Sequence, residues 1–169
     1  HPPAALINVE GVRDVAIHGL TLDGDGQGVD GLHVNDDAQP VVFSRSLVQG
    51  TATAVALSDP NTDVELFHNT LVSNTHGVSA TNCAPVDLRN TILANHSGTA
   101  LSYEGCAATQ LHTYNLYWQN GVDQNPATVG VGELYQDPLF VDPASGNFHL
   151  TAVSPAINAA NPSDPAPDA

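Results

Sequence analysis

The chain has 169 residues and a formal net charge of -15, because Lys+Arg number 3 against 18 for Asp+Glu. That length suits one domain with a real core. The charge repels phosphate backbones and anionic lipid headgroups, which argues against nucleic-acid and membrane-surface binding. No apolar run reaches the ~20 residues that span a bilayer, so we expect no membrane insertion in this segment.

A repeat runs through most of the sequence. Short β-branched runs, separated by Gly, Asn, Asp and Pro, recur roughly every 21 to 26 residues. Aligned by these runs, the chain shows two apolar columns: Ile7, Leu32, Val55, Val78 and Leu101, and then Val9, Val34, Leu57, Ala80 and Tyr103. Alternate strand residues point the same way, so both columns can face one interior. The repeat predicts an all-β fold, a single right-handed parallel β-helix of about five to six rungs with three short parallel sheets.

The first polar cluster along the chain is the Gly-rich stretch at residues 23–31. Carboxylates on such a loop suit calcium, so Asp23, Asp25 and Asp30 are candidate ligands. The spacing departs from the EF-hand pattern, because the twelfth position counted from Asp23 is Val34. Asp-Gly pairs are also ordinary turn residues. The stretch is therefore interpreted either as a calcium site or as a plain turn.

Asparagines recur where the second strand of each rung ends. The alignment gives one column of Gly19, Arg45, Asn69, Asn90 and Asn115, and another of Gly24, Gly50, Asn74, Asn95 and Asn120. Asn and Gly tolerate the left-handed backbone of tight bends. Stacked about 4.8 Å apart, their amides can also bond to one another along the axis. Two asparagine ladders at the corners are expected.

An outward column on the second strand offers the residue types of a catalytic site. The alignment gives His18, Ser44, His68, Arg89 and Tyr114, with Asp87 and His112 two positions earlier on the same outer face. β-Elimination of uronic polysaccharides needs a base and a cation that neutralises the carboxylate. His68, Asp87, Arg89, His112 and Tyr114 are the candidate catalytic residues. The alternative is a solvated polar face on which His112 and Asp87 pair.

The two cysteines, Cys83 and Cys106, are 23 residues apart and fall in one column of adjacent rungs. Stacked rungs would bring their Cα atoms to about 5 Å, inside the range for a disulfide. A disulfide is expected in an exported protein, and two buried thiols are the alternative.

The C-terminal part carries a distinctive pair of motifs. Residues 137–150 read DPLFVDPASGNFHL, and Ser154-Pro-Ala-Ile-Asn158 follows. These motifs resemble the closing stretch of choice-of-anchor Q type bacterial right-handed parallel β-helix proteins, within the pectate-lyase-like superfamily. Asn158 stands where that family usually has Asp. The repeats at 69–74, 90–95 and 114–120 also resemble the family's pattern, so the resemblance covers nearly the whole chain.

The resemblance implies a secreted or cell-surface protein, and it does not imply one activity, because relatives include polysaccharide lyases beside many proteins of no known role. We expect the β-helix to occupy residues 1–160. A C-terminal cap should begin at about 134, with Phe140, Phe148, Leu150 and Ile157 covering the open edge of the last rung. Residues 161–169 have the Pro/Asp-rich composition of a tail or linker.

Three functions follow as hypotheses. The first is a structural or adhesive extracellular module, or one that contacts a polysaccharide, without catalysis of its own. The second is the C-terminal part of a polysaccharide lyase or related carbohydrate-active enzyme, with an upstream domain. The third is a subunit that associates end to end, because the chain begins almost at once in a rung.

Overall fold

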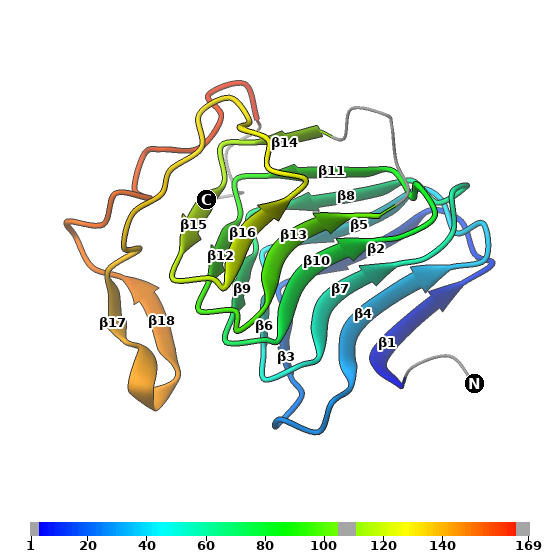
Figure 1. The fold of residues 1–169 in the computed structure, drawn as a ribbon, viewed down its shortest axis with the longest axis horizontal. Coiled ribbons are helices and arrows are strands. Elements are labelled where there is room, and N and C mark those ends of the chain that lie inside the picture. The colour runs from blue at the N-terminus through cyan, green and yellow to red at the C-terminus, as the bar shows by residue number, and fades with distance from the viewer. Residues whose placement is uncertain (1–3, 105–110, 165–169) are drawn as a thin grey trace.

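The computed structural model describes residues 4–104 and 111–164 and contains three parallel sheets that wind around one interior (Figure 1). The first sheet contains β1 (Ala5–Glu10), β4 (Asp30–Asn35), β7 (Thr53–Leu57), β10 (His76–Ala80), β13 (Thr99–Tyr103) and β16 (Val122–Asn125). The second contains β2 (Val15–His18), β5 (Val41–Ser44), β8 (Val64–Phe67), β11 (Val86–Arg89) and β14 (Leu111–Thr113). The third contains β3 (Thr21–Asp23), β6 (Leu47–Gln49), β9 (Thr70–Val72), β12 (Ile92–Ala94) and β15 (Leu116–Trp118).

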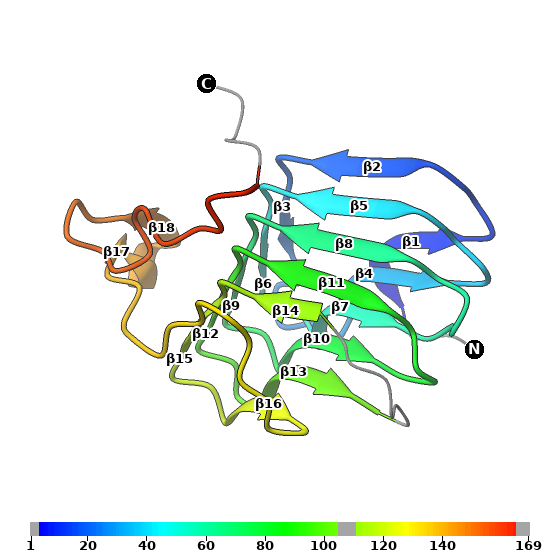
Figure 2. The same ribbon diagram turned by 90° about the horizontal axis from the view of Figure 1, so that it is seen from above.

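In each sheet a strand pairs with the equivalent strands of the turns before and after it. The protein is therefore a parallel β-helix, as the repeat predicts. Seen from above, the strands of the second sheet lie one behind another in chain order (Figure 2). No helix among the described residues is long and apolar enough to cross a membrane.

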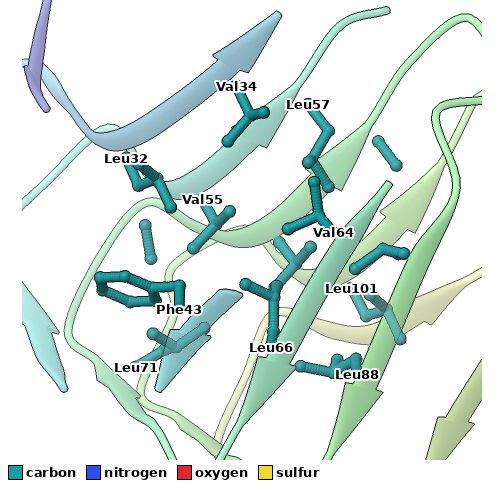
Figure 3. Packing of buried hydrophobic residues seen from close by; sticks show 14 of the residues in the cluster. Leu32, Val34, Phe43, Val55, Leu57, Val64, Leu66, Leu71, Leu88 and Leu101 are labelled. Atoms are coloured by element: carbon teal, nitrogen blue, oxygen red, sulfur yellow. The ribbon is translucent and has the colours of Figure 1, made fainter. Parts of the chain in front are cut away.

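The register of the first sheet confirms the two apolar columns. Ile7 pairs with Leu32, and the pairing continues through Val55 and Val78 to Leu101. Their side chains join those of the other two sheets in one interior cluster, in which Phe43, Leu66 and Leu88 have no exposed surface (Figure 3). Each buried aliphatic side chain of this kind contributes roughly 1.5–3 kcal/mol.

The corner between the second and third sheets is built by residues with positive φ. These are Gly19, Arg45, His68, Asn90 and Tyr114, with φ of 67°, 51°, 56°, 52° and 56°. The left-handed backbone turns the chain sharply and directs the next residue inward. Both expected asparagine columns are therefore displaced by one residue between rungs. Arg45, Gly50, Asn90 and Asn95 occupy bends, whereas Asn69, Asn74, Asn115 and Asn120 come one position after a bend; in the fourth rung the inward successors are Thr91 and His96.

The displacement has a simple origin in the third sheet. The sequence alignment matches Leu71 with Ile92, whereas the structure pairs Thr70 with Ile92 and Leu71 with Leu93. Leu71 and Leu93 belong to the interior cluster, so the burial of these two side chains fixes how the strands of the third sheet pair.

The four asparagines that do point inward bond to the backbone of the preceding rung. Asn69 Oδ1 accepts a hydrogen bond from Ser46 N (3.0 Å), and its Nδ2 donates to Phe43 O (2.9 Å). Asn74, Asn115 and Asn120 make equivalent pairs of bonds at their own corners. They alternate along the axis with Ser, Thr or His. Each amide therefore bonds to backbone groups at a bend and not to another asparagine amide.

The C-terminal region lies differently from the expected cap. The segment before it, around Leu134, closes the last rung: Leu134 forms a bridge with Leu116, and its N–H donates to Asn115 O (2.8 Å). The hairpin β17 (Phe140–Asp142) and β18 (Asn147–Leu150), joined by a 3-10 turn at Pro143–Ser145, stands beside the third sheet in both views (Figures 1 and 2). The tail thus borders the flank of the solenoid.

Part of the expected linker is bound to the solenoid. Asn161 N donates to Asn90 Oδ1 (2.7 Å), and Asp164 bonds to the Asn90 amide and pairs with Arg89 Nε (3.2 Å). Residues 165–169 lie outside the described part. Cys106 also lies outside it, so the disulfide with Cys83 stays a prediction.

Candidate functional site: a groove between the third sheet and the C-terminal tail

Among the cavities between the C-terminal tail and the third sheet, two share lining residues. The tail cavity (about 240 Å³) lies between β9, β12 and β15 on one side and Leu150, Ala156, Ala159 and Ala160 on the other. The hairpin cavity (about 580 Å³) lies between β3, β6 and β9 and residues 145–149. Both are lined by His68 and Thr70, so we treat them together as the corner groove. Its combined size falls in the range of roughly 300–1,000 Å³ usual for ligand sites.

The wall of the groove is set by the winding of the chain. Thr70, Ile92 and Leu116 are register partners on the outer face of the third sheet, and all three line the tail cavity. The left-handed corner places Arg45, His68 and Tyr114 along the rim. Phe148 and His149 of β18 line the opposite side of the hairpin cavity. The groove therefore combines apolar surface, hydroxyls, amides, imidazoles and two aromatic rings.

The charge of the groove differs from that of the molecule. The chain has 18 Asp+Glu, but no carboxylate side chain is among the described residues that line either cavity. Arg45, one of only three basic residues of the Lys/Arg type, lines the hairpin cavity. The described residues that line the groove therefore lack the acidic side chains that dominate the protein as a whole.

His68 sits where the two cavities meet and is half-buried. Burial lowers the pKa of its imidazole, and the positive charges of Arg45 and Arg89 lower it further, against the opposing effect of Asp164. The ring is therefore neutral at neutral pH, with one nitrogen able to donate and the other to accept a hydrogen bond. Its edge packs against Phe67, with ring centroids 5.7 Å apart.

Arg89 is held in a cluster of acidic side chains outside the groove. Its guanidinium pairs with Glu65 (2.9 Å), Asp87 (2.5 Å) and Asp164 (3.2 Å), and it lies 5.0 Å from the centre of the Phe67 ring. Burial opposes its charge, but the bond to Glu65 and the charges of Asp87 and Asp164 outweigh burial and raise its pKa. The charge of Arg89 is therefore already compensated within the protein.

The five catalytic candidates do not form one patch. Asp87 and Arg89 lie on the outer face of β11, and His68 and Tyr114 occupy the corner one position beyond their expected column. His112 pairs in register with Leu88, not with Asp87, and points inward, where it is 7% exposed. Its neighbour Leu111 takes the outward position and is 61% exposed.

His112 belongs instead to a polar cluster at the end of the solenoid, which we call the polar plug: His112, Tyr117, Gln124, Thr128, Glu133 and Tyr135. Glu133 is its centre, with a side chain that has no exposed surface. Its Oε1 is 2.7 Å from His112 Nδ1 and accepts from Tyr117 Oη (3.3 Å). Its Oε2 accepts from Gln124 Nε2 (2.9 Å), Gly130 N (2.9 Å) and Tyr135 Oη (3.0 Å).

These contacts keep Glu133 ionised. Burial raises the pKa of its carboxyl, but the hydrogen bonds from His112, Gln124 and Gly130 outweigh burial, so the pKa lies below its ordinary value. No repeat marks Gln124, Thr128 or Glu133 in the sequence, because each comes after the last full rung. The only sequence signal is the departure from the apolar column, where Gln124 replaces the expected aliphatic partner of Leu101.

The three calcium candidates make their contacts within the protein. Asp23 Oδ1 accepts from Asp25 N (2.9 Å), and its Oδ2 accepts from Gln49 Nε2 (2.7 Å). Asp30 is 5% exposed in β4 and pairs in register with Ala5. Among the described residues, no group of three or more His, Cys, Asp or Glu side chains is placed to hold a metal ion.

Fold and site together define the class of protein: a parallel β-helix with a groove along one flank. No protein-family model, curated protein or solved structure matches the chain.

Proposed function

We propose that this protein is a non-catalytic extracellular β-helix module that binds a polysaccharide in the corner groove. The observation that carries the proposal is the lining of the groove, whose described residues hold hydroxyl, amide, imidazole and aromatic groups and no carboxylate. Sugar recognition uses such groups, because hydroxyls need hydrogen-bonding partners of both kinds and the apolar face of a sugar ring packs on an aromatic ring.

The favoured ligand is a neutral polysaccharide. Neutral His68 offers both a donor and an acceptor, while the aromatic residues Tyr114 and Phe148 line the tail cavity and the hairpin cavity. The net charge of -15 on the whole chain repels uronic polymers at a distance. Among the described residues no group of three or more His, Cys, Asp or Glu side chains is placed to hold a metal ion, and the proposal uses no calcium bridge.

A secreted or cell-surface location is part of the proposal. Its support is the resemblance of residues 137–158 to the closing stretch of choice-of-anchor Q type β-helix proteins. The parallel β-helix itself agrees with that family and with many others.

The lyase alternative has weaker support. A lyase needs a cation that is available to the substrate carboxylate, but Arg89 already pairs with Glu65, Asp87 and Asp164. His112, a candidate base, is buried in the polar plug. End-to-end association is the third candidate, and the mass in solution tests it.

The proposal is tested by retention on immobilised neutral and uronic polysaccharides, with and without millimolar calcium. We expect calcium-independent retention on a neutral polymer. Retention only on a uronic polymer with calcium would contradict the choice of ligand. No retention on any polymer, with a mass in solution that grows with concentration, would favour the self-associating subunit.

A pair of matched substitutions locates the binding surface. Leu47→Asp places a carboxylate in the hairpin cavity, whereas Leu6→Asp makes the same change at an exposed position of β1 in the first sheet. We expect L47D to weaken retention at least tenfold and L6D to leave it unchanged. Equal losses for both variants would mean that the added charge acts at long range, and the groove would not be the binding site.

A further inference from the structure

The polar plug connects a hydroxyl, a base and a carboxylate through successive short contacts. Thr128 Oγ1 is 2.9 Å from His112 Nε2, and His112 Nδ1 is 2.7 Å from Glu133 Oε1. Ionised Glu133 fixes the ring proton on Nδ1, which leaves the lone pair of Nε2 facing the hydroxyl. This is the arrangement that activates a hydroxyl as a nucleophile.

A carboxamide lies beside that hydroxyl. Gln124 Oε1 accepts a hydrogen bond from the backbone N–H of Thr128 (3.3 Å), so the residue that carries the hydroxyl also polarises the carbonyl. The amide nitrogen of Gln124 donates to Glu133 Oε2 (2.9 Å) and to Tyr135 Oη (3.4 Å). Gln124 is 7% exposed, so water has little access to its carbonyl carbon.

We propose that Thr128 and Gln124 form an intramolecular ester, with His112 as the base and Glu133 as the residue that positions it. Thr128 Oγ1 attacks Gln124 Cδ, and His112 Nε2 accepts the hydroxyl proton. The backbone N–H of Thr128 stabilises the negative charge on Oε1. When the Cδ–Nε2 bond breaks, His112 returns the proton to the nitrogen, which leaves as ammonia. One C–O bond replaces one C–N bond, and no other reactant is needed.

The location of the proposed ester indicates that it stabilises the end of the solenoid. Gln124 is in β16, the last strand of the first sheet, and Thr128 is in the segment that follows. The ester would fasten this segment at the end where the solenoid stack stops, and an open end is the weakest part of a repeat protein. The chain has no lysine, so a side-chain isopeptide bond is not available to it.

The test is the mass of the intact purified chain, followed by fragmentation of the peptide that contains residues 124–128. We expect a mass lower than that of the sequence by one ammonia. Backbone cleavages between 124 and 128 should release no separate fragments, because the ester holds the two sides together. Asn120–Gly121 can also lose ammonia as a succinimide, but a full fragment series across 124–128 would then be seen and would overturn the proposal.

Two substitutions of Thr128 provide the control. Thr128→Val keeps the shape and removes the hydroxyl, and because Thr128 is exposed the variant should fold; we expect the full sequence mass. Thr128→Ser keeps a hydroxyl and should again lose one ammonia. His112→Gln should slow formation after refolding at least a hundredfold. A full mass for the unchanged chain, or conversion of Gln124 to Glu by hydrolysis, would overturn the proposal.

Discussion

At the scale of single residues, the interior asparagines show how a bend is made compatible with burial. A left-handed corner leaves backbone N–H and C=O groups without strand partners, and a buried polar group without a partner costs about 1–3 kcal/mol. Asn69 satisfies one group of each kind with a single side chain that is 3% exposed. A Ser or Thr side chain at the same position can bond to fewer backbone groups than an Asn side chain can. This difference explains why asparagine recurs at the inward corner position.

Removing this side chain should be costly. We expect Asn69→Ala to lower the free energy of unfolding by about 2–4 kcal/mol, because Ser46 N and Phe43 O both lose their partner inside the molecule. Asn61→Ala, at an exposed turn, is the matched control and should change stability by less than about 0.5 kcal/mol. Urea denaturation of both variants measures the difference, and equal midpoints would contradict the role given to Asn69.

At the scale of elements, the tail is fixed to the solenoid by a few polar contacts. Asp164 reaches both Arg89 and the amide of Asn90, and Asn161 reaches the carbonyl oxygen of the same amide. Asn90 can serve the tail because its left-handed bend turns its side chain outward. These contacts fix the C-terminal end of the segment that forms the outer wall of the tail cavity.

Weakening this anchor should loosen the wall of the groove without unfolding the β-helix. We expect Asp164→Asn to weaken the contact by about 1 kcal/mol and to speed hydrogen exchange in residues 156–164 severalfold. Exchange in β8 and β11 should not change. Asp142→Asn, at an exposed position of the hairpin, is the control. Faster exchange throughout the solenoid would mean that Asp164 supports the whole fold.

The sequence predicted the first sheet to the residue and the other two only approximately. In the first sheet, Leu32, Val55 and Val78 alternate with outward positions, so only one register buries them. In the third sheet, Thr70 precedes Leu71 and Val72, and either apolar residue could have been taken as the interior one. The same ambiguity placed His112 on the outer face, because the expected column set Tyr114 opposite Arg89, whereas Thr113 is the register partner of Arg89.

The site was harder to predict than the fold. The groove depends on where the tail lies, and no periodic pattern relates residues 145–160 to β6 or β9. The polar plug was missed because a repeat describes the middle of a solenoid and not its end. Glu133 contacts Gln124 and His112, and Thr128 joins them through its own bonds to His112 and Gln124.

At the scale of the whole molecule, a buried imidazole makes stability depend on pH. His96 is 1% exposed, and burial lowers its pKa from the ordinary 6.5 to about 4. The unfolded chain therefore binds a proton at a higher pH than the folded chain does. Stability is full above about pH 6.5 and is lost as the pH falls toward about 4.

His96→Leu should remove most of this dependence. Between pH 7 and pH 4 we expect the unchanged protein to lose roughly 3 kcal/mol more than the variant, since each pKa unit corresponds to about 1.4 kcal/mol. His149→Leu, at an exposed position of β18, is the control and should follow the unchanged protein. Urea midpoints measured across this pH range give the comparison. Parallel curves for all three proteins would place the acid sensitivity elsewhere.

The alternation of the inward corner residues has a consequence for how such a chain can lengthen. Asn69 and Asn115 are 46 residues apart, as are Asn74 and Asn120, and the rung between them carries Thr91 and His96 instead. A duplicated segment therefore preserves the alternation of residues at both corners only when it contains two turns. A gene duplication of one turn would bring two like corners together, whereas one of two turns would preserve the order, so longer and shorter versions of this β-helix should differ by even numbers of turns.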